Sequence, residues 1–195
     1  MARHFDRISE DHAAFIARQP MYFVATACAE GRINLSPKGL DGTLLVLGPN
    51  RVAFLNLTGS GNETAAHLAA DGRITLMFCS FDTAPLVLRL YGTGRAIHRH
   101  DPDWGGLDRL FPPLPGKRQI VTVAVDSVIT SCGFAVPRMT LDSERPTLTE
   151  WAAAKGEDGL RAYWRDKNAT SFDGLPTGIL GPDILGPDIL GSGDR

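Results

Sequence analysis

The sequence predicts a mainly β (α+β) protein in which an antiparallel barrel carries a few helices at its periphery. Six or seven runs of β-branched and apolar residues follow one another in hairpin-like order. The helical segments between them are few, and they do not alternate with the strands as the helices of a doubly wound parallel sheet do. This order favours an antiparallel barrel over a parallel α/β sheet.

The first half of the chain begins with a predicted helix from Ser9 to about Arg18. Ser9 precedes two acidic residues, which suits a helix start, and Pro20 requires the helix to have ended. The next predicted elements are a hairpin over 21–36 that turns at Glu30-Gly31, a hairpin of 43–48 and 52–57 that turns at Pro49-Asn50, and a short helix over 63–70.

The second half contains three more strand-like runs, over 73–81, 86–98 and 119–130. Four prolines between 101 and 117 predict a loop after a possible short helix. Thr147 and Glu150 have the spacing of a capping box that opens a helical segment, and Gly156 and Gly159 predict its division into two helices.

Residues 1–178 are predicted to form one domain, followed by a repeat tail over 179–195. The tail contains "ILGPDILGPDILG", in which Pro182 and Pro187 forbid a continuous helix. Two interpretations stay open. The tail is either a loosely ordered product of repeat expansion or an arm whose Ile-Leu pairs dock on a partner subunit.

The composition argues against several classes of protein. A formal net charge of −2 and a pI near 6.2 argue against nucleic-acid binding, and no apolar run approaches the length of a membrane span. Three distant cysteines without a C-x-x-C pair indicate a reduced, cytoplasmic protein. His98 and His100 share a strand face with no further spaced ligand, so no metal site is predicted.

The loop Thr58-Gly59-Ser60-Gly61-Asn62 is the first candidate for a binding site. It places hydroxyls, an amide and two glycines where a helix begins, and a helix start has spare N–H groups for an anion. The alternative is purely structural, because Ser60 and Glu63 fit a capping box. Neither well-known phosphate-loop motif is present.

Cationic side chains strengthen the prediction of an anion site. Asn34, Ser36 and Lys38 occupy alternate positions and therefore share one face of a strand. Arg89 lies inside an apolar strand, where a cation must find a partner or reach solvent. Together with the loop, these groups suit a phosphate dianion. A solvated Lys38 and a structural ion pair at Arg89 are the alternatives.

The segments "RINLSPKG", "VAFLNLTGSGNETAAHL" and "RITLMFCSF…LVLRLYGTGRA" resemble those of the pyridoxamine 5′-phosphate oxidase-like, FMN-binding split-barrel family. "SCGFAVPRM" and "WAAAKGEDGLRAYWRDKNATSFDGLP" resemble one uncharacterised bacterial branch of it, and the resemblance covers residues 10–178. It implies a six-stranded split barrel, a homodimer with FMN at the subunit interface, and an oxidoreductase that acts on a small molecule. The alternative is a non-catalytic flavin- or haem-binding or stress-related protein on the same barrel.

The same resemblance implies a set of cofactor-binding residues: Asn34, Leu35, Ser36, Lys38, Asn56, Leu57, Ser60, Asn62, Thr64 and Arg89. Two departures from the family pattern stand out. The Arg-Lys pair that follows the loop serine in the true oxidases is replaced here by Gly61-Asn62-Glu63. The short basic and aromatic segment that ends the true oxidases also has no counterpart in this chain. We therefore expect a substrate other than pyridoxamine phosphate. The sequence identifies no catalytic residue, and His67 is interpreted as a surface histidine.

Overall fold

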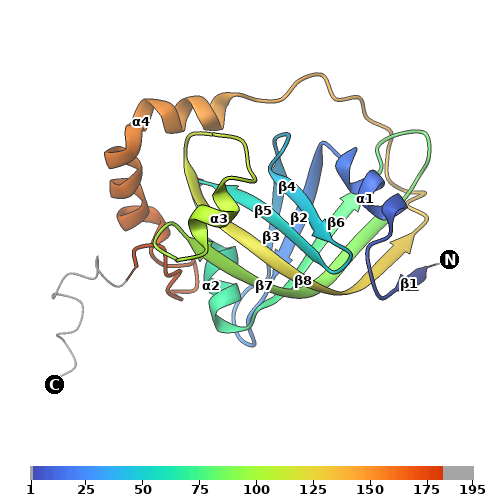
Figure 1. Ribbon diagram of the computed structural model, residues 1–195, viewed down its shortest axis with the longest axis horizontal. Coiled ribbons are helices and arrows are strands. Elements are labelled where there is room, and N and C mark those ends of the chain that lie inside the picture. Colours follow the sequence, from blue (N-terminus) through green and yellow to red (C-terminus); the bar gives the residue numbers. More distant parts are fainter. Residues whose placement is uncertain (1, 182–195) are drawn as a thin grey trace.

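The computed structural model describes residues 2–181, and within that range eight antiparallel strands form one curled sheet (Figure 1). The strands are β1 (Arg3–Phe5), β2 (Met21–Thr26), β3 (Asn34–Gly39), β4 (Leu44–Gly48), β5 (Arg51–Leu57), β6 (Arg73–Cys79), β7 (Val87–His98) and β8 (Lys117–Ser131). The helices are α1 (Glu10–Ala17), α2 (Glu63–Ala70), α3 (Trp104–Asp108) and α4 (Thr147–Tyr163), and a π-helical segment (Trp164–Asn168) continues α4. The predicted antiparallel, mainly β fold is confirmed.

The strands lie in the order β3-β2-β6-β7-β8-β5-β4, and β1 pairs with the last residues of β8. The two edges, β3 and β4, are consecutive in the chain, so the sheet curls into an open barrel with its ends joined by a short connection. The described strands number eight, compared with the six or seven predicted from the strand-like runs and the six implied by the family resemblance. Sequence patterns missed β1, because its three exposed residues show no alternation between buried and exposed positions.

A glycine allows the sheet to curl. The pairing of β7 with β8 shifts register between Tyr91 and Gly92. A Cβ atom at Gly92 would lie 2.0 Å from the carbonyl oxygen of Ala124, so only glycine fits this close approach of two strands. Register shifts of this kind bend a sheet, which lets the long strands β7 and β8 contribute to both halves of the barrel.

The sheet has one core on each face. Alternate residues of β5 separate them: Val52 and Phe54 belong to the barrel interior, whereas Ala53 and Leu55 pack beneath α3 and its flanking loop. Asn56 follows Phe54 on the interior face. A polar residue at this position indicates where the apolar interior ends.

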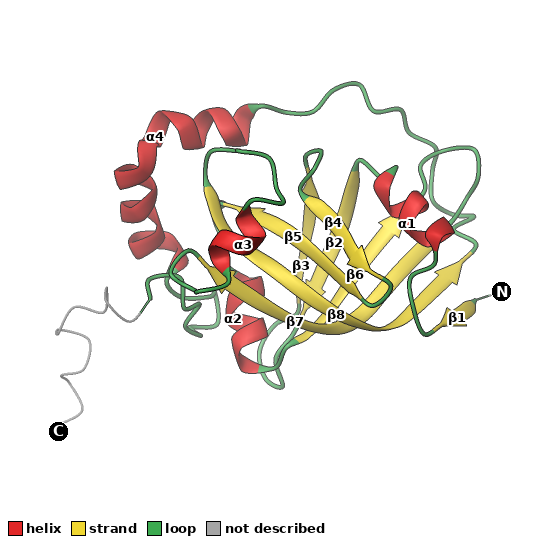
Figure 2. Ribbon diagram, viewed as in Figure 1, coloured by secondary structure: helices red, strands yellow, loops and turns green. Residues whose placement is uncertain are grey.

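Helices cover the ends and one side of the barrel (Figure 2). Helix α1 begins as predicted, with the Ser9 hydroxyl accepting from the backbone N–H of His12 at 3.2 Å. The predicted capping box at Thr147 is wrong: the N-cap residue is Pro146, and no side chain caps α4. Gly156 interrupts α4 as predicted, with a φ of 64°, whereas Gly159 is helical.

The start of the predicted tail packs on the domain. Ile179 is buried against Trp164 and Leu160 in a small third core. Residues 182–195, which include both prolines of the repeat, lie outside the described residues. In the part of the chain that is described, no helix has the length and apolarity to cross a membrane.

Candidate functional site

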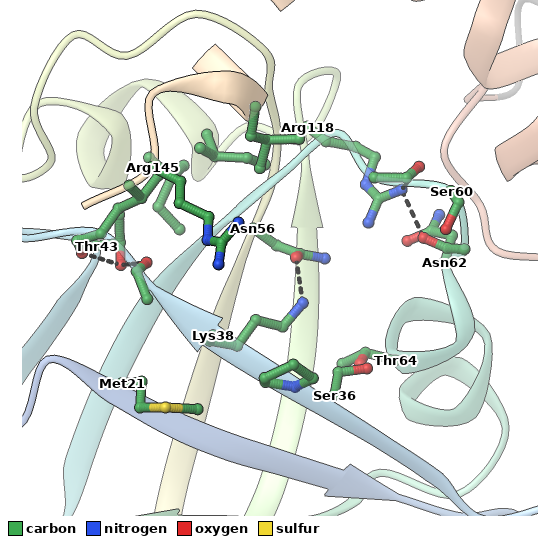
Figure 3. Close-up of a pocket in the computed structure, with 18 of the residues that line it drawn as sticks. Met21, Ser36, Lys38, Thr43, Asn56, Ser60, Asn62, Thr64, Arg118 and Arg145 are labelled. Carbon is green, nitrogen blue, oxygen red and sulfur yellow. Dashed lines mark hydrogen bonds between the residues drawn. The ribbon is translucent and has the colours of Figure 1, made fainter. Parts of the chain in front are cut away.

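A cavity of about 680 Å³ opens at one end of the barrel, where β3, β5 and the start of α2 converge (Figure 3). The segment between β8 and α4 forms its outer wall. Of the residues that the sequence identifies, those that line the cavity are Asn34, Ser36, Lys38, Asn56, Leu57, Ser60, Asn62 and Thr64. The structure therefore brings eight separately predicted residues into one place, and the size is typical of a pocket for a cofactor or small ligand.

Lys38 projects from β3 toward Asn56 in the middle of the cavity (Figure 3). Its Nζ donates a hydrogen bond to Asn56 Oδ1 at 2.8 Å. Burial lowers the pKa of Lys38 to about 8, and the nearby charge of Arg118 acts in the same direction. Among the described residues, no carboxylate forms an ion pair with Lys38, so its charge is available to a ligand.

Arg118, at the start of β8, is a cavity residue that sequence reasoning missed. Its side chain is almost fully buried, and burial lowers its pKa to about 10. Its Nη1 donates to the carbonyl of Gly61 at 2.8 Å, and its Nε has no hydrogen-bond partner among the described residues. Within residues 2–181 it has no carboxylate partner either. A cation before an apolar strand is an ordinary sequence feature, so only the three-dimensional structure identifies Arg118 as a residue of the cavity.

The loop before α2 places further hydrogen-bond donors in the same cavity as Lys38 and Arg118. Helix α2 has Asn62 as its N-cap residue, and no side chain caps it. The Ser60 hydroxyl is exposed at the cavity. The structural alternative, a capping box formed by Ser60 and Glu63, is therefore wrong. Glu63 instead accepts from the backbone N–H of Phe172 at 3.0 Å, more than a hundred residues away.

The loop is held from behind by the π-helical segment. Asn168 is fully buried and donates to the carbonyls of Gly59 and Ser60, at 3.1 and 3.4 Å. The indole N–H of Trp164 donates to the Thr58 hydroxyl at 2.9 Å. These contacts hold the loop from the side away from the cavity, and Gly59, Ser60 and Gly61 line the cavity itself.

A polar network connects the floor of the cavity to α2. Asn34 donates to the hydroxyls of Thr26 and Thr64, both at 3.2 Å, and accepts from the Ser36 hydroxyl at 3.0 Å. The Thr26 hydroxyl lies 3.1 Å from Nδ1 of His67. The interpretation of His67 as a surface histidine is wrong: it is buried and part of this network.

Two predicted residues lie away from the cavity. Leu35 points to the opposite face of β3 and is 62% exposed. Arg89 alternates with Leu88 and Leu90 of the barrel interior and so projects from the outer face, with its guanidinium 3.5 Å from the Ser131 hydroxyl. Asn62 lines the cavity, but its side chain is engaged with Gln119 and Asn168 behind the loop.

Comparison with known proteins finds similarity in both sequence and fold. The family model described as "Pyridoxamine 5′-phosphate oxidase" matches residues 8–132. The pyridoxamine 5′-phosphate oxidase family protein ustO of Aspergillus flavus is 39% identical over 191 residues, which cover 88% of this chain and 76% of that protein.

Two solved structures of HupZ from group A Streptococcus have a similar fold. One of them, a variant with a single histidine replaced by alanine, superimposes with a TM-score of 0.53 at 18% identity, covering 64% of this chain and 99% of HupZ. The protein without that substitution gives a TM-score of 0.51 at 17% identity, covering 62% of this chain and 91% of HupZ. At these identities the likeness concerns the fold alone.

Proposed function

The chain belongs to the pyridoxamine 5′-phosphate oxidase family, and we propose that its cavity binds FMN for a flavin-dependent oxidoreductase. The observation that supports this most strongly is a pair of cations, half-buried Lys38 and buried Arg118, that face one cavity beside an uncapped helix start and form no ion pair among the described residues. An unpaired buried charge is costly, and an anionic ligand would remove that cost. A phosphate dianion fits this donor set.

The residues divide into a phosphate end and a ring end. Lys38, Arg118, the Ser60 hydroxyl and the first N–H groups of α2 would hold the phosphate. Asn34, Ser36 and Asn56 would lie along the ribityl chain and the polar edge of the ring. The side chains of Met21, Leu40 and Leu57 would supply apolar contact to the ring faces.

Bound FMN would supply the redox chemistry, and the residues of this chain would bind and orient it. The hydrogen bonds from Asn168 would keep the loop in position, so little reorganisation would accompany binding. The substrate would be a small molecule. No side chain of the cavity is assigned as a general acid or base.

We further propose that the protein is a homodimer. Edge strand β3 and the residue before it carry apolar side chains to solvent, Leu35 at 62% and Ile33 at 78% exposure. Exposed apolar side chains on an unpaired strand edge are typical of an association surface. Sedimentation equilibrium would give twice the chain mass if this is right and the chain mass if it is wrong.

The test of the phosphate site compares FMN with riboflavin, which lacks the phosphate. We expect the wild-type protein to bind FMN more tightly than riboflavin. Each charge-assisted hydrogen bond to phosphate contributes about 1.5–3 kcal/mol, so Lys38→Gln should weaken FMN binding about 10- to 100-fold. The affinity for riboflavin should change little. Equal affinities for the two flavins in the wild type would refute the phosphate assignment.

Arg89→Gln is the matched control, because it removes a half-buried strand cation that does not line the cavity. It should leave the FMN affinity unchanged. Oxidoreductase function is tested separately by oxidation of NADPH or NADH by the FMN-loaded protein. A rate no higher than that of free FMN at the same concentration, for both reductants, would favour a flavin carrier over an enzyme that uses these reductants.

A further inference from the structure

The outer wall of the cavity is an extended segment between β8 and α4. It crosses above the sheet before α4 begins (Figure 2). Two contacts fix it: the backbone N–H of Met139 donates to the carbonyl of Phe81 at 3.0 Å, and Glu144 Oε1 accepts from the backbone N–H of Asp41 at 2.7 Å. These contacts bring Leu141 and Arg145 to the mouth of the cavity.

Arg145 directs its guanidinium into the cavity, on the side opposite Ser60, with Lys38 and Asn56 between them (Figure 3). Among residues 2–181 it forms no ion pair, and the neighbouring Glu144 carboxylate instead accepts a hydrogen bond from the backbone N–H of Asp41. The cavity therefore holds a third cation, separated from the loop that would bind phosphate.

Apolar side chains form part of the cavity wall beside Arg145. Leu141, Leu148, Pro20 and Met21 line this end of the cavity. A planar guanidinium matches the two oxygens of a carboxylate in a bidentate pair, and an apolar wall suits a hydrocarbon body.

We propose that Arg145 binds the carboxylate of the substrate, which is a small monocarboxylate with an apolar or aromatic body. This inference rests on the proposed function, because FMN at the phosphate end leaves Arg145 to the second ligand. Arg145 determines specificity by charge, and the leucines of the wall determine it by shape. The segment that carries Arg145 lies beyond residue 132, where the match to the family model ends.

The test is calorimetric titration of the FMN-loaded protein with benzoate and with benzamide, its neutral counterpart. Phenylacetate and phenylacetamide form a second pair with a longer body. We expect the wild type to bind at least one carboxylate at least tenfold more tightly than its amide. Arg145→Gln should remove that preference. Arg138→Gln, which removes an exposed arginine of the same segment that does not line the cavity, should keep it.

Three outcomes would overturn the proposal. These are no preference for carboxylate over amide in the wild type, an unchanged preference in Arg145→Gln, and an FMN affinity of Arg145→Gln reduced more than threefold, which would assign Arg145 to the cofactor. Failure of the proposed function is recognised separately, since the wild type would then not bind FMN. The same titrations on the flavin-free protein would still show whether Arg145 selects carboxylates.

Discussion

Asn168 and Arg118 form a buried hydrogen bond of 2.8 Å, in which Arg118 Nη1 donates to Asn168 Oδ1. Fifty residues separate them in the chain. Asn168 also donates to two carbonyls of the loop before α2, and Arg118 donates to a third. One amide therefore orients both the cation and the loop that we propose for the phosphate, although Asn168 does not itself line the cavity.

Asn168→Ala should reduce both stability and FMN affinity. Removal of the amide takes one acceptor from Arg118, which keeps the carbonyl of Gly61, and takes a donor from the carbonyls of Gly59 and Ser60. We expect these losses to cost about 1–3 kcal/mol of unfolding free energy. We expect FMN binding to weaken about tenfold as the loop loses its fixed geometry. Urea denaturation and flavin fluorescence titration measure the two effects. Lys167→Ala, at the exposed neighbouring position, should change neither.

Sequence reasoning predicted eight residues that line the cavity because the elements that carry them are local. A loop of hydroxyls and glycines before a helix, and polar residues at alternate positions of a strand, can both be recognised within about ten residues. Arg118 and Asn168 could not be found in this way, since their roles depend on the pairing of β5 with β8 and on the return of the chain after α4.

Arg89 is the opposite case, a residue that the sequence suggests for the site but that lies away from the cavity. A cation among leucines looks functional in sequence, but alternation along β7 places Leu88 and Leu90 inside the barrel and Arg89 outside. The face of a strand that lies inside a barrel is set by tertiary packing. The capping-box patterns at Ser60 and Thr147 failed for a related reason, because the helices begin at other residues and Glu63 bonds to a distant backbone.

Ser60→Ala distinguishes a ligand contact from a helix cap. The Ser60 hydroxyl does not cap α2, so its removal should change the unfolding free energy by less than about 0.5 kcal/mol. FMN affinity should fall by about fivefold through one lost hydrogen bond, whereas riboflavin affinity should not change. Thermal unfolding without and with FMN measures both quantities. A loss of about 1 kcal/mol without ligand would indicate a cap after all.

Lys38 makes FMN binding depend on pH above neutrality. Its pKa of about 8 in the free protein means that the ammonium loses its proton as the pH rises past 8, and a phosphate dianion binds the charged form. The dissociation constant should therefore rise about 20-fold between about pH 7.5 and 9.5. Lys38→Gln should bind FMN weakly but with little change over this range. A flat profile for the wild type would show that the Lys38 charge does not contact the ligand.

His98 has a buried ring that should be neutral in the folded protein. Among residues 2–181 its Nδ1 has no hydrogen-bond partner, and the ring stacks on His100 with 5.4 Å between the ring centroids. Burial lowers the pKa of His98 to about 4, the charges of His100 and Arg118 act in the same direction, and Asp101 opposes them. The protein should therefore be sensitive to acid, because protonation of this ring favours the unfolded chain.

The pH window of this effect follows from the two pKa values of His98. The folded-state pKa lies below the unfolded value of about 6.5. The stabilisation that comes from keeping the ring neutral is therefore complete above about pH 6.5 and is lost as the pH falls toward 4. The unfolding free energy should drop by about 2 kcal/mol between about pH 7 and pH 4.5 through this residue. Urea denaturation at the two pH values measures the drop.

His98→Gln, which cannot titrate, should be less stable at neutral pH but should lose about 2 kcal/mol less over the same interval. His4→Gln is the control, since that histidine is exposed on β1. Equal acid sensitivity of wild type and His98→Gln would contradict a buried neutral ring at this position.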